Sequence, residues 1–66
     1  MFYYRVEYSY PIGGGRRACE RDVYLAENCQ EAVDLARNEY GHLEGMRVDR
    51  VWKENHGSWM AVNAWR

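Results

Sequence analysis

The 66 residues of this chain are enough for one small domain, and 47% of them are hydrophobic and 15% aromatic. This composition argues against disorder, which goes with few apolar residues and high net charge. The formal net charge of -1 argues against nucleic-acid binding through bulk basicity. No apolar run approaches the roughly 20 residues of a membrane span, and the charged, alternating start differs from a secretory signal. We therefore expect one soluble cytoplasmic domain.

The clearest strand is predicted over 2–10, where large apolar residues alternate with polar ones. The segment 11–15, PIGGG, then breaks the alternation, and its three glycines predict a mobile loop because glycine loses much entropy on ordering. Arg16 and Arg17 follow this loop, where we expect them to be exposed and within reach of a partner. The residues predicted to pack under a helix are Phe2, Tyr4, Val6, Tyr8 and Tyr10.

A second strand is predicted over 18–26, with Cys19, Val23 and Leu25 as its inward set. Arg21 falls among these three residues. A charge at such a position is typical of an edge strand, where it discourages aggregation. The first two strands therefore form a hairpin whose second member lies at the edge of the sheet.

One amphipathic helix is predicted over 28–41. Asn28 is a favourable N-cap, Glu31 can complete a capping box, and Gly41 suits a left-handed residue that ends the helix. The region is acidic, because residues 26–45 hold five acidic side chains against Arg37 alone. The residues that share one face at helical spacing are Cys29, Ala32, Val33, Ala36, Tyr40 and Leu43, with Leu35 at the margin.

A second hairpin is predicted over 46–54 and 58–65. The segment 55–57, Asn-His-Gly, fits a three-residue loop with a left-handed glycine, which sets Lys53 opposite Trp59 and Arg47 opposite Trp65. A two-residue turn at 56–57 would shift the register by one and mix the faces, so we favour the longer loop. One face then holds Met46, Val48, Trp52, Met60, Val62 and Ala64 with Arg50 as the exception, and the other holds Arg47, Asp49, Val51, Lys53, Trp59, Ala61, Asn63 and Trp65.

The predicted fold is α+β, with the order β-β-α-β-β and one helix packed on one face of a four-stranded antiparallel sheet. The other face is open to solvent. Exposed apolar patches tend to be interaction sites, and tryptophan and arginine often dominate binding energy. The competing interpretation is cation–π and cross-strand pairing that only stabilises a thin sheet. The candidate partner-binding residues are Tyr3, Arg5, Arg16, Arg17, Arg47, Lys53, Trp59 and Trp65.

Other kinds of site are less well supported. Aromatic platforms with arginine suit single-stranded nucleic acid, but the motif and second helix of RNA-recognition domains are missing. The candidate metal ligands, Cys19, Cys29, His42 and His56, lack the close pairs of zinc sites. Cys29 could have a lowered pKa at a helix N-terminus, yet no acid, base or oxyanion group accompanies it. We expect free thiols, no cofactor, no metal and no catalytic residue.

Three segments are similar to one family of small phage proteins. The helix segment 32–39, AVDLARNE, carries an Ala-x-x-x-Ala pattern, 46–51 reads MRVDRV, and 59–62 reads WMAV. They are similar to an Ala-x-x-x-Ala helix, a Met-Arg-aliphatic-acid-x-Val strand and a Trp-aliphatic-Ala-aromatic strand of that family. With the element order and a nearly equal length, most of the chain after the glycine loop resembles the ninth family of type I-F anti-CRISPR proteins. The helix differs from that family in one respect: the family is rich in lysine around the helix, whereas this helix is acidic.

The resemblance implies a non-enzymatic inhibitor through which a phage evades host defence. It would bind the protein backbone of a type I CRISPR RNA-guided surveillance complex and block target DNA binding. The implied partner is a protein or ribonucleoprotein complex of the host defence machinery, in the host cytoplasm and away from any membrane. Two alternatives stay open: a small nucleic-acid-binding β-sheet protein, and a homodimeric phage accessory protein. Both a monomer and a homodimer are compatible with the sequence.

Overall fold

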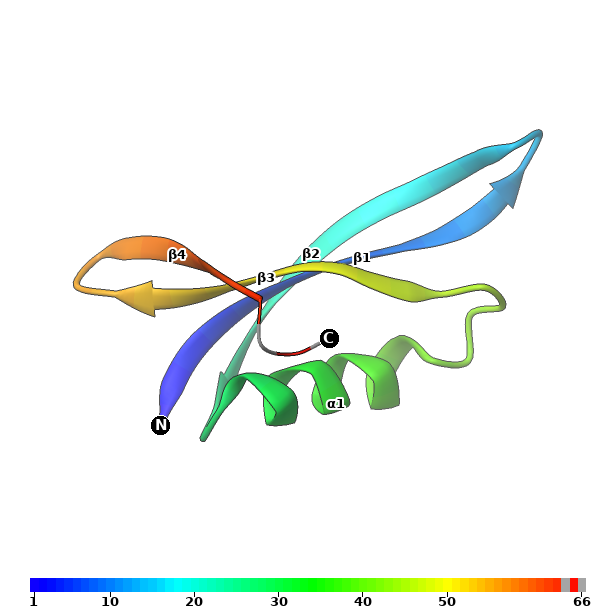
Figure 1. Ribbon diagram of the computed structural model, residues 1–66. Helices are drawn as coiled ribbons and strands as arrows, with labels where there is room; N and C mark the ends of the chain where they lie inside the picture. The colour runs from blue at the N-terminus through cyan, green and yellow to red at the C-terminus, as the bar shows by residue number, and fades with distance from the viewer. Residues whose placement is uncertain (64, 66) are drawn as a thin grey trace.

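Figure 1 shows the computed structural model, which describes residues 1–63 and 65. The sheet order is β2-β1-β3-β4 with all neighbours antiparallel, so the predicted α+β fold is confirmed. Position 64, predicted to face inward, lies outside the described residues. Within those residues no helix has the length and apolar character to cross a membrane. The elements are β1 (Phe2–Gly13), β2 (Arg16–Ala26), α1 (Cys29–Tyr40), β3 (Arg47–Asn55) and β4 (Ser58–Val62).

The core lies between α1 and one face of the sheet, and the helix runs below the strands in Figure 1. The helix contributes small residues, Ala32, Val33 and Ala36, all fully buried. Small side chains let the helix approach the bulkier sheet residues closely, as the dense packing of protein interiors requires. The remaining buried members of the core are Tyr4, Val6, Ala26, Val51 and Trp65.

The predicted Asn28 cap at the start of α1 is confirmed, but Glu31 bonds the amide before Asn28 rather than that of Asn28, and the predicted end of the helix is wrong. The Asn28 side chain accepts a hydrogen bond from the Glu31 amide at 2.9 Å, and the Glu31 carboxylate accepts one from the Glu27 amide at 3.2 Å. The prediction of a left-handed Gly41 is wrong, because Gly41 stays right-handed with φ -64°. Its amide donates to the Arg37 carbonyl at 2.7 Å and simply continues the helical pattern.

The first hairpin has longer strands and a tighter turn than predicted, in place of the predicted mobile loop over 11–15. β1 continues through Pro11 to Gly13, and Gly14 and Gly15 form a two-residue turn with φ of 63° and 73°. The pairing is irregular between Pro11 and Gly13, where Ile12 is an extra residue on β1. A bulge accommodates proline because proline cannot donate to the strand ladder.

The face assigned to β2 is wrong, although its predicted edge position is confirmed. Tyr8 lies opposite Glu20, and directly opposite residues share a face of the sheet. The helix side of β2 is therefore polar, and tyrosine hydroxyls satisfy its acids: Tyr8 donates to Asp22 at 3.4 Å and Tyr10 donates to Glu20 at 2.7 Å. The residues predicted to face inward, Cys19, Val23 and Leu25, point away from α1.

The second hairpin has the two-residue turn that the sequence analysis set aside. His56 and Gly57 have φ of 51° and 82°, which is the backbone that two-residue hairpin turns require. Asn55 consequently pairs with Ser58. The Glu54 carboxylate accepts a hydrogen bond from the Gly57 amide at 2.8 Å and stabilises the turn. The predicted three-residue loop and its register are therefore wrong.

A β-bulge in β3 changes which residues face the helix. Glu7 pairs with Arg50 and Tyr8 pairs with Val48, which leaves Asp49 as the extra residue. Because of this bulge, Val48 and Val51 both face α1 although they are three residues apart. In a regular strand two such residues would point to opposite faces of the sheet. The predicted faces of β3 are therefore interchanged along 50–54, whereas those of β4 are as predicted, because Val62 pairs with Val51 on the helix side.

The two C-terminal tryptophans provide a test of where the core lies. Trp65 is 8% exposed and belongs to the core, whereas Trp59 lies half-buried on the opposite face. Replacing Trp65 with alanine should cost about 3–5 kcal/mol of stability, which matches the whole stability expected from so small a core. Far-UV circular dichroism should therefore show a largely unfolded Trp65→Ala variant.

The matched control is Trp59→Ala, which should remain folded at the same temperature. A folded Trp65→Ala variant beside an unfolded Trp59→Ala variant would contradict the assignment of these two side chains.

Candidate functional site

The face of the sheet opposite α1, called here the open face, is centred on Arg5. Its guanidinium carbon lies 4.4 Å from the ring centroid of Trp59 and 5.6 Å from that of Trp52. Three strands build this arrangement, since Arg5 of β1 pairs with Trp52 of β3, and β4 brings Trp59 opposite Glu54. Stacking on indole rings favours a cation by about 0.5–2 kcal/mol depending on its exposure.

A buried carboxylate extends this arrangement along the sheet. The Glu7 side chain is 9% exposed and lies 2.8 Å from Arg21 and 3.8 Å from Arg50. Burying a carboxylate is unfavourable unless charged or hydrogen-bonding partners compensate it. Arg21 also lies over Trp52, with its guanidinium carbon 5.7 Å from the ring centroid. We call Arg5, Glu7, Arg21, Arg50, Trp52 and Trp59 the arginine–tryptophan cluster.

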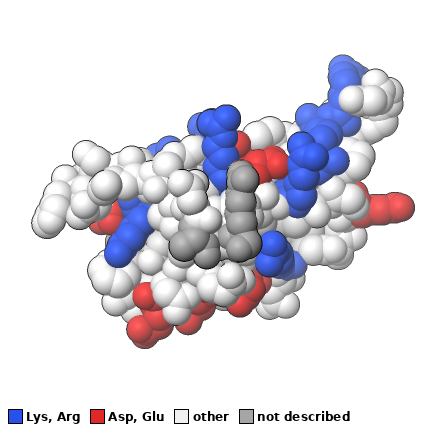
Figure 2. Space-filling view, in the orientation of Figure 1, with Lys and Arg blue, Asp and Glu red and all other residues white. Residues whose placement is uncertain are grey.

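Charge is divided between the two sides of the molecule. Figure 2 shows acidic side chains gathered along the lower side, where α1 lies, and basic ones over the sheet. Burial and the neighbouring Glu39 carboxylate raise the pKa of Tyr24, so its hydroxyl stays protonated as a donor on this acidic side. The acidic side of the molecule is formed by Glu20, Asp22, Glu27, Glu31, Asp34 and Glu39.

Four of the eight predicted binding residues lie on the open face: Tyr3, Arg5, Arg47 and Trp59. Arg47 forms an ion pair with Asp49 at 2.8 Å and keeps 63% of its side chain exposed. Arg16 is exposed beside the Gly14–Gly15 turn. These five residues are therefore accessible to a partner.

Of the other three predicted residues, two are wrong in their placement and the third is engaged within the chain. Lys53 lies on the helix side, with its ammonium 3.8 Å from the ring centroid of Phe2. Trp65 is buried in the core. Arg17 is only half-exposed, and its guanidinium donates to Ser9 and to the Gly45 carbonyl at 2.7 Å, so it ties β2 to the loop before β3.

Four members of the site were not predicted from the sequence: Glu7, Arg21, Arg50 and Trp52. Trp52 and Arg50 were assigned to the inner face because the predicted register was one residue out. The His56-Gly57 pair was the available signal, since a glycine at the second position suits a two-residue hairpin turn. The bulge at Asp49 has no comparable sequence signal, because charged residues in β-strands are common at ordinary edge positions too.

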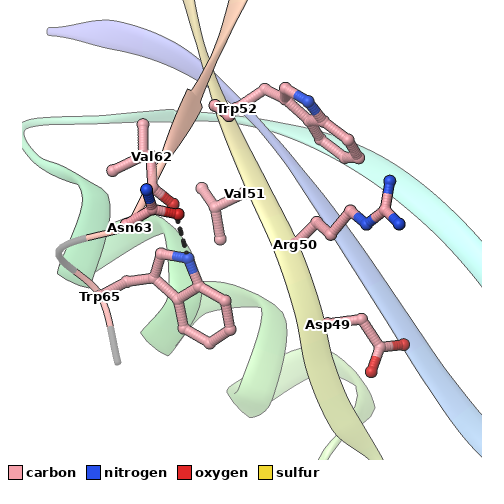
Figure 3. A pocket seen from close by; sticks show the side chains of 8 residues that line it. Asp49, Arg50, Val51, Trp52, Val62, Asn63 and Trp65 are labelled. Atoms are coloured by element: carbon pink, nitrogen blue, oxygen red, sulfur yellow. Dashed lines mark hydrogen bonds between the residues drawn. The ribbon is translucent and has the colours of Figure 1, made fainter.

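A small cavity of about 200 Å³ opens where β4 ends (Figure 3). Val51 and Val62 form its apolar floor, and Arg50 and Asp49 lie at its opposite side. Trp65 lines it as well, and its indole N–H donates to the Val62 carbonyl at 2.9 Å. The described lining residues include no Ser, Cys or His, so they provide no Ser–His or Cys–His pair.

Metal-ligating side chains meet on the open face at a place the sequence did not predict. Ligand atoms of Glu7, Cys19 and Asp49 lie within 4.8 Å of one another. Guanidinium groups already neutralise both carboxylates, because Glu7 pairs with Arg21 and Asp49 pairs with Arg47. Burial tends to raise the pKa of Asp49, but hydrogen bonds from Ser9 and Arg47 outweigh it, and the pKa is lowered.

The two thiols differ in their surroundings, and both are free. Burial raises the pKa of Cys29, so the expectation of a lowered pKa at the helix N-terminus is wrong. Cys19 is exposed on the open face. Iodoacetamide should therefore alkylate Cys19 about tenfold or more faster than Cys29 at neutral pH, because the thiolate is the reactive form.

Mass spectrometry of timed samples measures both alkylation rates, and Cys19→Ser should remove the fast phase alone. A fast phase that survives in Cys19→Ser would contradict the burial of Cys29.

The role of Glu7 in holding the cluster is also testable. Glu7→Gln keeps the shape of the side chain but removes its charge from between two guanidinium groups. Both arginines are more than half exposed, so solvent screening limits the loss to about 1–2 kcal/mol. Urea denaturation measures the free energy of unfolding.

Glu54→Gln is the matched control, because glutamine retains the oxygen that accepts from the Gly57 amide. Equal losses in the two variants would contradict a special role for Glu7.

The groups available on the open face are those of molecular recognition. Guanidinium edges bind carboxylates and phosphates in a bidentate way, and indole faces stack on flat groups. No protein-family model, curated protein or solved structure matches this chain.

Proposed function

We propose that this chain is a non-enzymatic inhibitor of the anti-CRISPR kind, which binds a type I RNA-guided surveillance complex and blocks target DNA binding. The observation that carries the proposal is Arg5 held between Trp52 and Trp59 on an exposed sheet face. The resemblance of segments 32–39, 46–51 and 59–62 to the ninth type I-F family supplies the class of partner.

The arginine–tryptophan cluster supports the docking step. Residues of these two types dominate the energy of protein interfaces because they combine a large contact area with directed hydrogen bonds. Stacking restrains the Arg5 guanidinium in advance, so less side-chain entropy is lost when a partner binds. The partner surface that fits this face presents carboxylates beside apolar or flat groups.

The acidic side supports the blocking step. RNA-guided complexes hold nucleic acid in a positively charged channel. The carboxylates of α1 and of the helix side of β2 carry the same sign of charge as a DNA backbone. An inhibitor docked by its basic face therefore presents an acidic side that competes with target DNA for positive surface.

A second candidate function is binding of single-stranded nucleic acid by the same face. The observation that favours it is again the indole pair around Arg5, since bases stack on aromatic rings beside cations. Affinity for free DNA or RNA should then fall steeply with salt as counterions are released. The acidic side chains lie mainly on the helix side, so they would not repel a nucleic acid that binds the open face, despite the net charge of -1.

The deciding experiment uses purified type I surveillance complexes and a labelled target DNA in a gel-shift assay. Wild-type protein should prevent DNA binding by the complex. Arg5→Lys keeps the charge but loses the planar, stacked guanidinium, so its inhibitory affinity should fall about tenfold or more, as for a central interface residue.

Arg37→Lys is the matched control, because it makes the same chemical change on α1 and should inhibit like the wild type. Failure to bind any type I complex would overturn the proposal, as would equal losses in the two variants. Binding of free single strands with a steep salt dependence, without inhibition, would instead establish the second candidate.

A further inference from the structure

The two edges of the sheet are protected to different degrees. β4 has only five residues, and the part of β3 that extends beyond it carries a bulge with Arg47, Asp49 and Arg50. Short strands, bulges and charges are the usual means of preventing a sheet edge from pairing. β2 has eleven residues, contains no proline, and keeps a continuous register from Arg17 to Ala26. No strand in the described part of the chain pairs with its outer edge.

The outer edge of β2 also carries exposed apolar side chains on the open face. Val23 and Leu25 are 54% and 47% exposed, and Tyr3, which lies opposite Leu25, is 52% exposed. β-Branched and aromatic neighbours of this kind stabilise strands that pair across them. The apolar strip is confined to the half of β2 nearest α1, because the preceding residues 20–22 are all charged.

We propose that a second copy of this chain pairs with this edge, β2 against β2 in antiparallel fashion, to form an eight-stranded sheet. A two-fold axis perpendicular to the sheet relates the copies, so each residue pairs with one on the same face. Each copy has one such edge, so the association closes at a dimer. This inference does not depend on the identity of the inhibited complex.

The charges and the length of β2 together favour one register for this pairing. A pairing centred on Glu20, Arg21 or Asp22 places that residue opposite its own copy, and like charges directly opposite are destabilising. A pairing centred on Val23 places valine opposite valine, opposes no like charges and pairs residues 20–26, whereas a centre nearer Ala26 pairs fewer residues because β2 ends there. Arg21 then lies opposite Leu25 of the second copy, Asp22 opposite Tyr24, and Glu20 opposite Ala26.

Analytical ultracentrifugation of the chain alone tests the dimer. Wild-type protein should sediment as a dimer of the 7.9 kDa chain within the micromolar to millimolar range. Val23→Lys sets two ammonium groups opposite each other and should weaken association about tenfold or more, through like-charge repulsion in a desolvated pair. Ile12→Lys is the matched control, since Ile12 is 55% exposed near the hairpin turn and remote from this edge.

Cysteine cross-linking tests the register in a Cys19→Ser, Cys29→Ser background. Val23→Cys should form an intermolecular disulfide under oxidising glutathione, because directly opposite α-carbons lie about 4.5–5.5 Å apart, within disulfide range. Leu25→Cys should not, because it lies opposite position 21 of the second copy.

A wild-type monomer throughout the concentration range would overturn the dimer, and so would a dimer that Val23→Lys leaves unchanged. Cross-linking through position 25 in preference to position 23 would overturn the Val23-centred register. Far-UV circular dichroism of each variant ensures that loss of association is distinguished from loss of folding.

Discussion

The middle of the central strand β1 is buried on both faces, although a helix covers only one of them. Val6 faces α1 and is fully buried, while Glu7, the next residue, faces the other way and is 7% exposed. Side chains alone cover Glu7, chiefly the guanidinium groups of Arg21 and Arg50. A chain of 66 residues buries only about 60% of its unfolded surface, and a second helical layer would need more residues. Arginine side chains over the sheet take the place of that layer.

This constraint explains why stability and recognition share the same residues. The guanidinium groups that shield Glu7 and stack on Trp52 and Trp59 are also the groups a partner would meet. Their positions are held by neighbours in three strands, so the surface is organised before any partner arrives. Arg17, by contrast, contributes to stability rather than to recognition, because its guanidinium is bonded to Ser9 and to the Gly45 carbonyl.

The sequence allowed the element order, the face assignment of β1 and the Asn28 cap to be predicted, because each depends on local residue spacing. The registers of both hairpins could not be fixed in that way. They depend on two-residue turns with positive φ, Gly14–Gly15 and His56–Gly57, and on extra residues at Ile12 and Asp49. A shift of one residue exchanges the two faces of a strand, and this moved Trp52 to the open face. Trp65 lies beyond the end of β4 and packs into the core, which strand alternation does not predict.

The type of candidate site on the open face was predicted correctly, but several of its residues were not. Arg5 and Trp59 were placed correctly because they lie on strands whose exposed face alternates simply, and Trp52 took the place predicted for Trp65. An indole beside a cation was therefore predicted on the open face, while the buried Glu7 that organises it was not. A lone glutamate in an alternating strand gives no sign that two arginines from neighbouring strands will enclose it.

The geometry of the sheet connects partner binding with self-association. Strands joined across a perpendicular two-fold axis keep the same face upward, so two copies paired through β2 would present both open faces on one side of a continuous sheet. Two linked binding faces raise the effective concentration of the second contact once the first is made. That gain requires a target with repeated surfaces at matching spacing, as in an assembly built from copies of one subunit. A target with a single surface would engage one face and leave the other free.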